Sequence, residues 1–308
     1  MKPKMPGLAL AALALAALPA CSTREAAGKP DVLHVLLIPA DGGTESGTLA
    51  DYKPVFDAVG KSAKLRFDLK VAQSYGAVVE AMCNGTADVA FVGPVTYLQA
   101  RHRGCADLLA VAVKDGQSVY YAGLFARKEA PIARIEDLRG KSVAFGDVNS
   151  TSSFVFPVAM LLQAHVDPVK DLGPLRLTGS HANSLAALIA HRVDAAALSF
   201  DSYDKAVREG VPGATDVRVV ARSEAIPYPP LVMNSKLRED LKQRLRAAFE
   251  GVAKAPGIRP DMIRGYGGAQ VDGYDAHFPA ERFDSAARKM ALLSDELKGE
   301  ILKKSAER

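Results

Sequence analysis

A run of small and hydroxyl-bearing residues stands between two apolar segments: Gly146-Asp147-Val148-Asn149-Ser150-Thr151-Ser152-Ser153. We predict a strand over 142–145 before this run and a helix over 153–164 after it. Backbone N–H groups in the first turn of a helix lack internal acceptors, and the helix dipole there favours negative charge. With the hydroxyl groups as further donors, the turn could hold a phosphorus oxyanion without lysine or arginine. The alternative is a simple N-cap, for which Ser, Thr and Asn are preferred and one residue suffices.

Catalytic chemistry is not supported by the same residues. Ser150 or Ser152 with His181 could imitate a nucleophile and its base, but the chain has no Gly-x-Ser-x-Gly elbow and no identifiable orienting acid. The six histidines show no metal-ligand spacing, and neither a His-Glu-x-x-His motif nor a phosphate-cradling P-loop is present. We therefore predict a binding protein rather than an enzyme, with no metal and no cofactor.

The segments that must position the hydroxyl turn alternate between strand and helix patterns. The apolar run 32–38 is typical of a strand covered on both faces, and 65–71 shows the two-residue alternation of a half-buried strand. We predict an α/β fold of two lobes joined by two crossings, with a ligand cleft between the lobes. The Pro-rich run 226–230 is the expected second crossing, which divides the fold into 32–122 plus 226–308 and 123–225.

The N-terminus predicts an exported, lipid-anchored protein. A basic start precedes an apolar stretch from Leu8 to Ala20 that is too short to span a bilayer, as in a secretory signal over residues 1–20. Cys21 follows a Leu-Pro-Ala sequence that looks like a bacterial lipobox, and 21–31 is a polar tether. The alternative is an ordinary signal peptide with an incidental cysteine. We expect the mature chain on the periplasmic side of the cell envelope, attached to the membrane only by lipid.

Charge and cysteine content limit the partners. The formal net charge is +4, and the charges are mixed along the chain without a basic patch among aromatics, so nucleic acid is not an expected partner. We expect a monomer. Cys83 and Cys105 would face an oxidising compartment after export, and we predict that they pair; two buried free thiols are the alternative.

Several short motifs, in their order and spacing, resemble the periplasmic phosphonate-binding proteins of phosphate/phosphite/phosphonate ABC transporters. The resemblance covers about residues 32–254. It implies a type II periplasmic-binding-protein fold that closes around its ligand, and an ABC transporter permease as partner. The matching motifs are Tyr75-Gly76-Ala77-Val78-Val79-Glu80, Ala87-Asp88-Val89-Ala90-Phe91-Val92-Gly93-Pro94, Leu138-Arg139-Gly140-Lys141, Asn149-Ser150-Thr151-Ser152, Gly179-Ser180-His181 and Val193-Asp194-Ala195-Ala196-Ala197.

The resemblance also implies a set of ligand contacts. Tyr75 and Tyr120 would contact the anion and its substituent through their hydroxyl groups. Phosphonate oxygens would be bound, from the second lobe, by Ser150, Thr151, Ser152 and His181. The residues alone leave other interpretations open: a core tyrosine for Tyr75, and a surface or capping histidine for His181. Tyr120 is preferred to its neighbour Tyr121 by resemblance, since strand alternation turns only one of them to a given side.

Asp201 falls where aminophosphonate binders of this family carry an acid that receives the ligand's amine. Its alternative is an N-cap for the helix that begins near Ser202. A second acid, expected near Pro229, is absent. The departure leaves an aminoalkyl ligand unsupported and keeps phosphite, methylphosphonate and other small phosphonates open.

The resulting hypothesis is a solute-binding lipoprotein that captures a small phosphorus oxyanion, either a phosphonate, phosphite or phosphate, for an ABC importer. One alternative is a binding subunit that reports its ligand to a membrane signalling receptor, because both tasks need lobes that close on a ligand. Another alternative is a binder of a different small anion such as a sulfonate, which differs only in the detail of the pocket.

Overall fold

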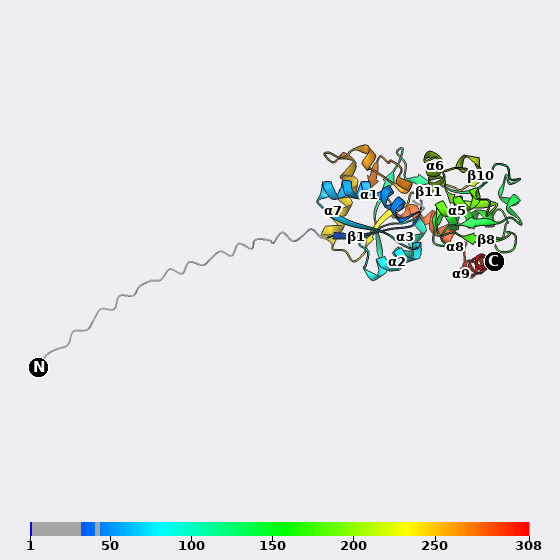
Figure 1. The fold of residues 1–308 in the computed structure, drawn as a ribbon. Helices are drawn as coiled ribbons and strands as arrows, with labels where there is room; N and C mark the ends of the chain where they lie inside the picture. The colour runs from blue at the N-terminus through cyan, green and yellow to red at the C-terminus, as the bar shows by residue number, and fades with distance from the viewer. Residues whose placement is uncertain (2–31, 41–43, 308) are drawn as a thin grey trace.

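The computed structural model describes Met1, residues 32–40 and residues 44–307. Cys21, the tether over 21–31 and the apolar stretch of the predicted signal lie outside the described residues. Figure 1 shows two α/β bodies side by side; we call the one that holds β1 (Val32–Leu37) the first lobe and the one that holds β8 (Leu175–Leu177) the second lobe. Within the described residues, no helix is long and apolar enough to cross a membrane.

The first lobe is built on a six-stranded sheet with the order β13-β4-β12-β3-β1-β2. Strand β1 pairs in parallel with β2 and β3, as predicted, whereas β12 runs antiparallel to β3 and β4. The expectation that β1 is covered on both faces is wrong at its start, where Val32 and His34 are exposed. The other strands of the sheet are β2 (Arg66–Val71), β3 (Val89–Phe91), β4 (Ala106–Val113), β12 (Pro230–Asn234) and β13 (Gly273–Asp275).

The helices of the first lobe begin and end at recognisable capping residues. Thr44 accepts a hydrogen bond from the backbone N–H of Gly47 at 3.1 Å and so caps α1, and α2 ends at Gly85, whose φ of 74° is a left-handed conformation that glycine adopts easily. Buried residues of all four helices join one hydrophobic core with the sheet. The helices are α1 (Glu45–Ala63), α2 (Tyr75–Asn84), α3 (Pro94–His102) and α7 (Glu239–Gly251).

The second lobe is built on a five-stranded sheet with the order β10-β6-β9-β7-β8. Alternate residues of β9 belong to different core clusters, Ala195 and Ala197 to one and Ala196 and Leu198 to the other, so both faces of this sheet are covered. Its other elements are β6 (Ala122–Arg127), β7 (Val143–Phe145), β9 (Ala195–Ser199), β10 (Val217–Arg222), α4 (Phe156–Gln163), α5 (His181–Ile189) and α6 (Phe200–Arg208).

Two crossings join the lobes and pair with each other. The first contains β5 (Val119–Tyr120) and the second contains β11 (Ile226–Pro227), which lies in the Pro-rich run. These short strands form an antiparallel pair in which Tyr120 is opposite Ile226. The chain leaves this crossing at Tyr121 and enters the sheet of the second lobe at β6.

The C-terminal helices depart from the expected division of the chain. The sequence predicts residues 226–308 in the first lobe, but Ile301 of α9 (Asp295–Ala306) belongs to a core cluster of the second lobe. Lys304 Nζ donates to the carbonyls of Val169 at 2.5 Å and Leu172 at 2.6 Å. Helix α8 (Asp284–Ala291) connects the two lobes, with Ala286 in the first core and Met290 against the second. Short 3-10 helices occupy Ile135–Leu138, Ala214–Asp216, Val252–Lys254, Pro260–Met262, Tyr266–Gly268 and Ala280–Phe283.

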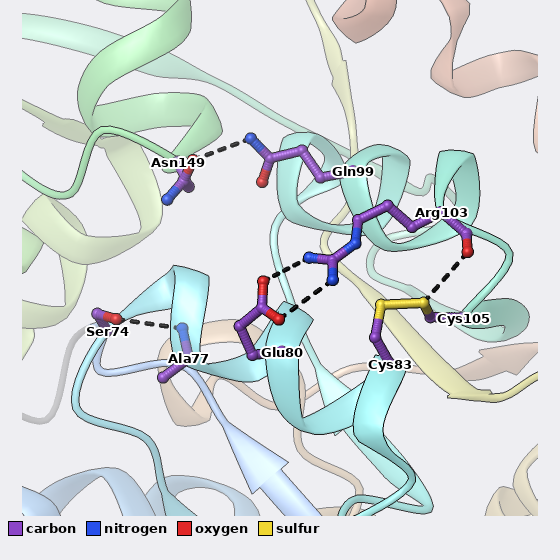
Figure 2. Close-up of polar contacts among 8 residues, drawn as sticks. All are labelled: Ser74, Ala77, Glu80, Cys83, Gln99, Arg103, Cys105 and Asn149. Carbon is purple, nitrogen blue, oxygen red and sulfur yellow. Dashed lines mark hydrogen bonds and ion pairs between the residues drawn. A yellow bond between two sulfur atoms is a disulfide. The ribbon is translucent and has the colours of Figure 1, made fainter. Parts of the chain in front are cut away.

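Cys83 and Cys105, the two cysteines that the sequence analysis pairs, form a disulfide with an Sγ–Sγ distance of 1.97 Å. Figure 2 shows it joining α2 to the segment between α3 and β4. Beside the disulfide, the carboxylate of Glu80 in α2 forms a bidentate ion pair with the guanidinium of Arg103. One of its two hydrogen bonds, from Nη2 to Oε2, measures 3.1 Å. These contacts fix α2 against α3, the two helices whose first turns face the second lobe.

Candidate functional site

The site residues expected from the sequence gather where helices follow the carboxyl ends of parallel strands. Helices α2 and α3 follow β2 and β3 in the first lobe, and α5 and α6 follow β8 and β9 in the second. Because the carboxyl ends of parallel strands share one edge of a sheet, these helix starts lie at that edge. The two edges meet, since the backbone N–H of His181 donates to the carbonyl of Ala40 in the first lobe over 3.2 Å.

The hydroxyl run forms a tight helix start after β7. Ser150 is the N-cap, and its Oγ accepts hydrogen bonds from the backbone N–H of Ser153 at 3.2 Å and from Ser153 Oγ at 2.7 Å. The first turn is a π-helical turn over Thr151–Val155, and α4 continues from it. Gly146 permits this packing, because a Cβ there would lie 2.1 Å from Ser153 Oγ. Ser150 therefore has the N-capping role that its residue type favours.

Thr151 and Asn149 join this turn to the first lobe. The backbone N–H of Val95, in the first turn of α3, donates to Thr151 Oγ1 over 2.9 Å. The hydroxyl of Thr96 donates to the carbonyl of Asn149 at 3.1 Å. Figure 2 shows the Gln99 side chain of α3 reaching Asn149, where Nε2 donates to Oδ1 over 2.9 Å. The hydroxyl of Thr151 is thus engaged in an interlobe contact, which the sequence did not predict.

Ser152 differs from its neighbours, because Ser150 Oγ and Thr151 Oγ1 accept hydrogen bonds and keep only their O–H protons for a ligand. Its side chain is only 2% exposed, and among the described residues no hydrogen bond of this hydroxyl is present. The backbone N–H groups of Thr151 and Ser152 belong to the first helical turn, where internal acceptors are lacking. Together, the hydroxyl and the two amides form a buried set of donors suited to an oxyanion.

His181 is the first residue of α5, and its ring is 1% exposed. Nδ1 accepts a hydrogen bond from the backbone N–H of Ser199 at 3.0 Å, so the neutral ring carries its proton on Nε2. Burial lowers the pKa of His181 to about 3, and the ring is therefore neutral at pH 7. Its side chain is an oriented N–H donor. The interpretation of a surface or capping histidine is wrong, because the ring is buried and Ser180 is the N-cap.

Tyr75 is the first residue of α2 and is 1% exposed. Its backbone N–H donates to Oδ2 of Asp147, in the second lobe, over 3.2 Å. Oδ1 of Asp147 accepts from the backbone N–H of Asn149 at 2.8 Å. Burial raises the pKa of Asp147, and these two hydrogen bonds oppose the rise. The carboxylate couples the hydroxyl turn to the start of α2, while the Tyr75 ring belongs to the core of the first lobe.

Tyr120 is the fully buried member of the Tyr120-Tyr121 pair, at 2% exposed. Tyr121 is only half-buried, and the guanidinium of Arg222 lies 3.5 Å from the centroid of its ring. The ring centroid of Tyr120 lies 5.8 Å from that of Tyr266 and 6.1 Å from that of Tyr228. Tyr120 is therefore part of an aromatic group at the crossings.

Tyr266 is a residue of this group that sequence reasoning missed. Its ring lies 6.1 Å from that of His181, and its hydroxyl contacts Ser199 Oγ and Ser202 Oγ, each at 3.3 Å. Through these contacts Tyr266 joins the first lobe to the start of α6 in the second lobe. The available signal was its setting, Gly265-Tyr266-Gly267-Gly268, since a tyrosine among glycines lacks the apolar periodicity of a core element.

Asp201 lies in the first turn of α6 and does not cap it. Ser199 is the N-cap, and its Oγ accepts from the backbone N–H of Ser202 at 3.1 Å. The Asp201 carboxylate is 12% exposed and lies 3.5 Å from Lys114 Nζ in the first lobe. Burial raises the pKa of Asp201, and the charge of Lys114 opposes the rise. All seven residues proposed from the sequence as ligand contacts are thus at or beside the meeting of the lobes.

Comparison with known proteins identifies the family. A family model described as "ABC transporter, phosphonate, periplasmic substrate-binding protein" matches residues 43–276. The chain belongs to this family. It is also 29% identical over 237 residues to the phosphate-import protein PhnD of Mycolicibacterium smegmatis, which covers 73% of each chain.

Solved structures of this periplasmic binding-protein family show the same fold. A binding protein component of an ABC phosphonate transporter from Pseudomonas aeruginosa superposes with a TM-score of 0.75 at 21% identity, over 90% of this chain and 97% of the other. A Prochlorococcus marinus protein in complex with methylphosphonate gives a TM-score of 0.70 at 18% identity, over 85% and 99%. The type II periplasmic-binding-protein fold is confirmed, and the chain is a binding component of an ABC transporter rather than an enzyme.

Proposed function

We propose that this phosphonate-family binding protein is a periplasmic lipoprotein that captures a small phosphorus oxyanion between its lobes and delivers it to an ABC permease. The observation that carries the proposal is the buried donor set at the start of the hydroxyl turn. The Ser152 hydroxyl, the first-turn amides and His181 Nε2–H are all supplied by the second lobe at helix starts. Tyr75 and Tyr120 close the site from the first lobe and the crossing.

Phosphorus oxyanions suit this donor set for chemical reasons. A tetrahedral oxyanion presents several oxygens that each accept hydrogen bonds, and helix-start amides and hydroxyl groups can meet them without a formal cation. The neutral His181 ring adds a donor at pH 7 and gains charge if the bound anion raises its pKa. A sulfonate carries less charge, so a pocket of this kind would bind it more weakly.

Two ligands, phosphate and methylphosphonate, are supported by the relatives' names and complexes. The mycobacterial relative is named for phosphate import, and the Prochlorococcus structure holds methylphosphonate. Phosphite is the smallest member of the same chemical series. We propose that the ligand is one of these three, and that the seven residues Tyr75, Tyr120, Ser150, Thr151, Ser152, His181 and Asp201 form or border its site.

Lipid attachment at Cys21 is the second part of the proposal. The cysteine follows a signal-like segment, and β1 begins at Val32, which leaves 21–31 as a tether to the membrane. The mature chain would then act as a monomer beside its permease. Intact mass of the mature protein tests the anchor: a diacylglyceryl adduct on Cys21 supports it, and a chain cleaved elsewhere without lipid refutes it.

Calorimetric titration tests the ligand. The chain without its signal segment and Cys21 retains every helix and strand that the structure describes. It is titrated with phosphite, methylphosphonate, 2-aminoethylphosphonate, phosphate and methanesulfonate. Tight binding of one phosphorus anion, with weaker binding of the sulfonate, supports the proposal. Absence of binding for all five ligands refutes the proposal. Stronger binding of methanesulfonate would instead assign the site to sulfonates.

A further inference from the structure

A lysine and an aspartate from different lobes meet beside the proposed anion site. Lys114 directly follows β4 of the first lobe, where its backbone N–H and carbonyl both pair with Gln117, at 2.7 and 3.0 Å. This tight turn places Lys114 Nζ 3.5 Å from Oδ1 of Asp201 in α6. The lysine side chain is 38% exposed and the aspartate side chain 12%. The charged atoms therefore meet at the edge of the interface, with the carboxylate on the buried side.

Asp201 is tied closely to the donors proposed for the anion. It lies two residues after Ser199, whose backbone N–H orients the His181 ring and whose hydroxyl contacts Tyr266. The start of α6 is thus held against α5 and the first lobe at once. The substituent of a phosphorus anion bound at His181 would extend into surroundings that include Asp201.

The charge balance at Asp201 depends on Lys114. Burial disfavours the carboxylate and raises its pKa, the nearby Asp204 does the same, and Lys114 is the largest effect in the opposite direction. An unpaired buried carboxylate is costly, so a cation beside it is stabilising. Lys114 provides that cation from the protein itself.

We propose that the Lys114–Asp201 pair determines ligand specificity by disfavouring phosphorus anions that carry an ammonium substituent. The inference rests on the proposed function. A ligand ammonium would have to displace Lys114 from Asp201 or share the carboxylate with it, and two cations held at one carboxylate repel each other. Phosphite, phosphate and methylphosphonate carry no ammonium group and leave the Lys114–Asp201 pair intact. The pair thus serves as a built-in substitute for the ligand amine.

The experiment compares 2-aminoethylphosphonate with methylphosphonate by calorimetry, in the chain without its signal segment and Cys21. In Lys114→Met, 2-aminoethylphosphonate should gain about fivefold in affinity relative to methylphosphonate. This change is equivalent to the free energy of one partly exposed ion pair. Lys114→Arg keeps the charge and should keep the wild-type ratio. Lys170→Met, which removes a lysine from the exposed Asp167 pair outside the interface, controls for net charge.

A double variant identifies the group responsible. If the freed carboxylate receives the amine, the gain in Lys114→Met should disappear in Lys114→Met/Asp201→Asn. An unchanged ratio in Lys114→Met, or a gain that persists without Asp201, overturns the inference while the proposed function stands. Absence of binding of every phosphorus anion to the wild type overturns both. Circular dichroism melting of each variant separates loss of folding from loss of binding.

Discussion

Nδ1 of His181 accepts a hydrogen bond from the backbone N–H of Ser199, and the two nitrogens lie 3.0 Å apart. This contact joins the first residue of α5 to the last residue of β9 and decides which ring nitrogen carries the proton. The ring can therefore present only Nε2–H to a ligand. A protonated ring would lose the Ser199 hydrogen bond, and this has a measurable consequence for stability.

We expect the free energy of unfolding to fall as the pH drops below 6.5. The unfolded chain takes up a proton at His181 near the ordinary pKa of 6.5, whereas the folded ring, with a pKa of about 3, does not. The stability from the neutral ring is thus present above pH 6.5 and lost progressively toward pH 3. Between pH 6.5 and pH 5 the loss attributable to this histidine is about 2 kcal/mol.

Urea unfolding at pH 7.5, 6.0 and 5.0 measures this effect. His181→Gln keeps a hydrogen-bonding side chain but cannot titrate, so its stability should depend less steeply on pH. His102→Gln, at an exposed position of α3, is the matched control and should follow the wild type. Parallel curves for wild type and His181→Gln would contradict the prediction.

Two serines of the hydroxyl run should respond differently to substitution. Ser152→Ala should weaken binding of the phosphorus anion by about 1 to 3 kcal/mol, because a charge-assisted hydrogen bond is lost. Ser150→Ala should also weaken binding, and it should reduce stability by about 1 kcal/mol because Ser150 caps the turn.

Paired calorimetry and urea unfolding distinguish these effects, with Ser305→Ala on α9 as a surface control. Unchanged affinity in Ser152→Ala would remove this hydroxyl from the site. Unchanged affinity in Ser150→Ala would leave Ser150 with its capping role alone.

The disulfide should stabilise the first lobe. It closes a 22-residue segment that contains β3 and α3, and restricting a loop of this size in the unfolded chain is worth about 3 kcal/mol. Reductant should lower the free energy of unfolding of the wild type by that amount. Cys83→Ala/Cys105→Ala should show the same loss without any further effect of reductant. A wild type that is indifferent to reductant would contradict the prediction.

The Asn149–Gln99 hydrogen bond should favour the closed arrangement of the lobes. Removing it by Asn149→Ala should weaken ligand binding by about 1 kcal/mol, since closure would lose one interlobe hydrogen bond. Gln99→Ala should have a similar effect, and the double variant should add little to either. Strictly additive losses would show that the two side chains do not act through this contact.

Local sequence patterns predicted those parts of the site in which a residue type has few structural roles. The hydroxyl run after a short apolar strand predicted a helix start, and Ser150 caps that helix. Its neighbour Thr151 could not be interpreted in the same way, because its hydroxyl partner, the Val95 amide, is 56 residues away in the other lobe. A sequence pattern records a residue's local conformation and not its distant partner.

Helix α9 and Tyr266 show the same limit at larger scale. The sequence of α9 does not show which of the two cores buries Ile301. The placement was decided by the fit of Ile301 and by Lys304 reaching the carbonyls of Val169 and Leu172. Tyr266 lies in an irregular glycine-rich segment where periodicity carries no information.

The sequence alone determined the α/β class, the strand and helix segments around the hydroxyl turn and the motifs of the family, because hydrophobic periodicity and capping residues act over a few neighbouring positions. Only the tertiary structure decided that Ser152 keeps an available hydroxyl, that His181 is neutral with its proton on Nε2, and that Asp201 meets Lys114. Burial, hydrogen-bond partners and charge balance are set by segments that are distant in the chain and adjacent only after folding.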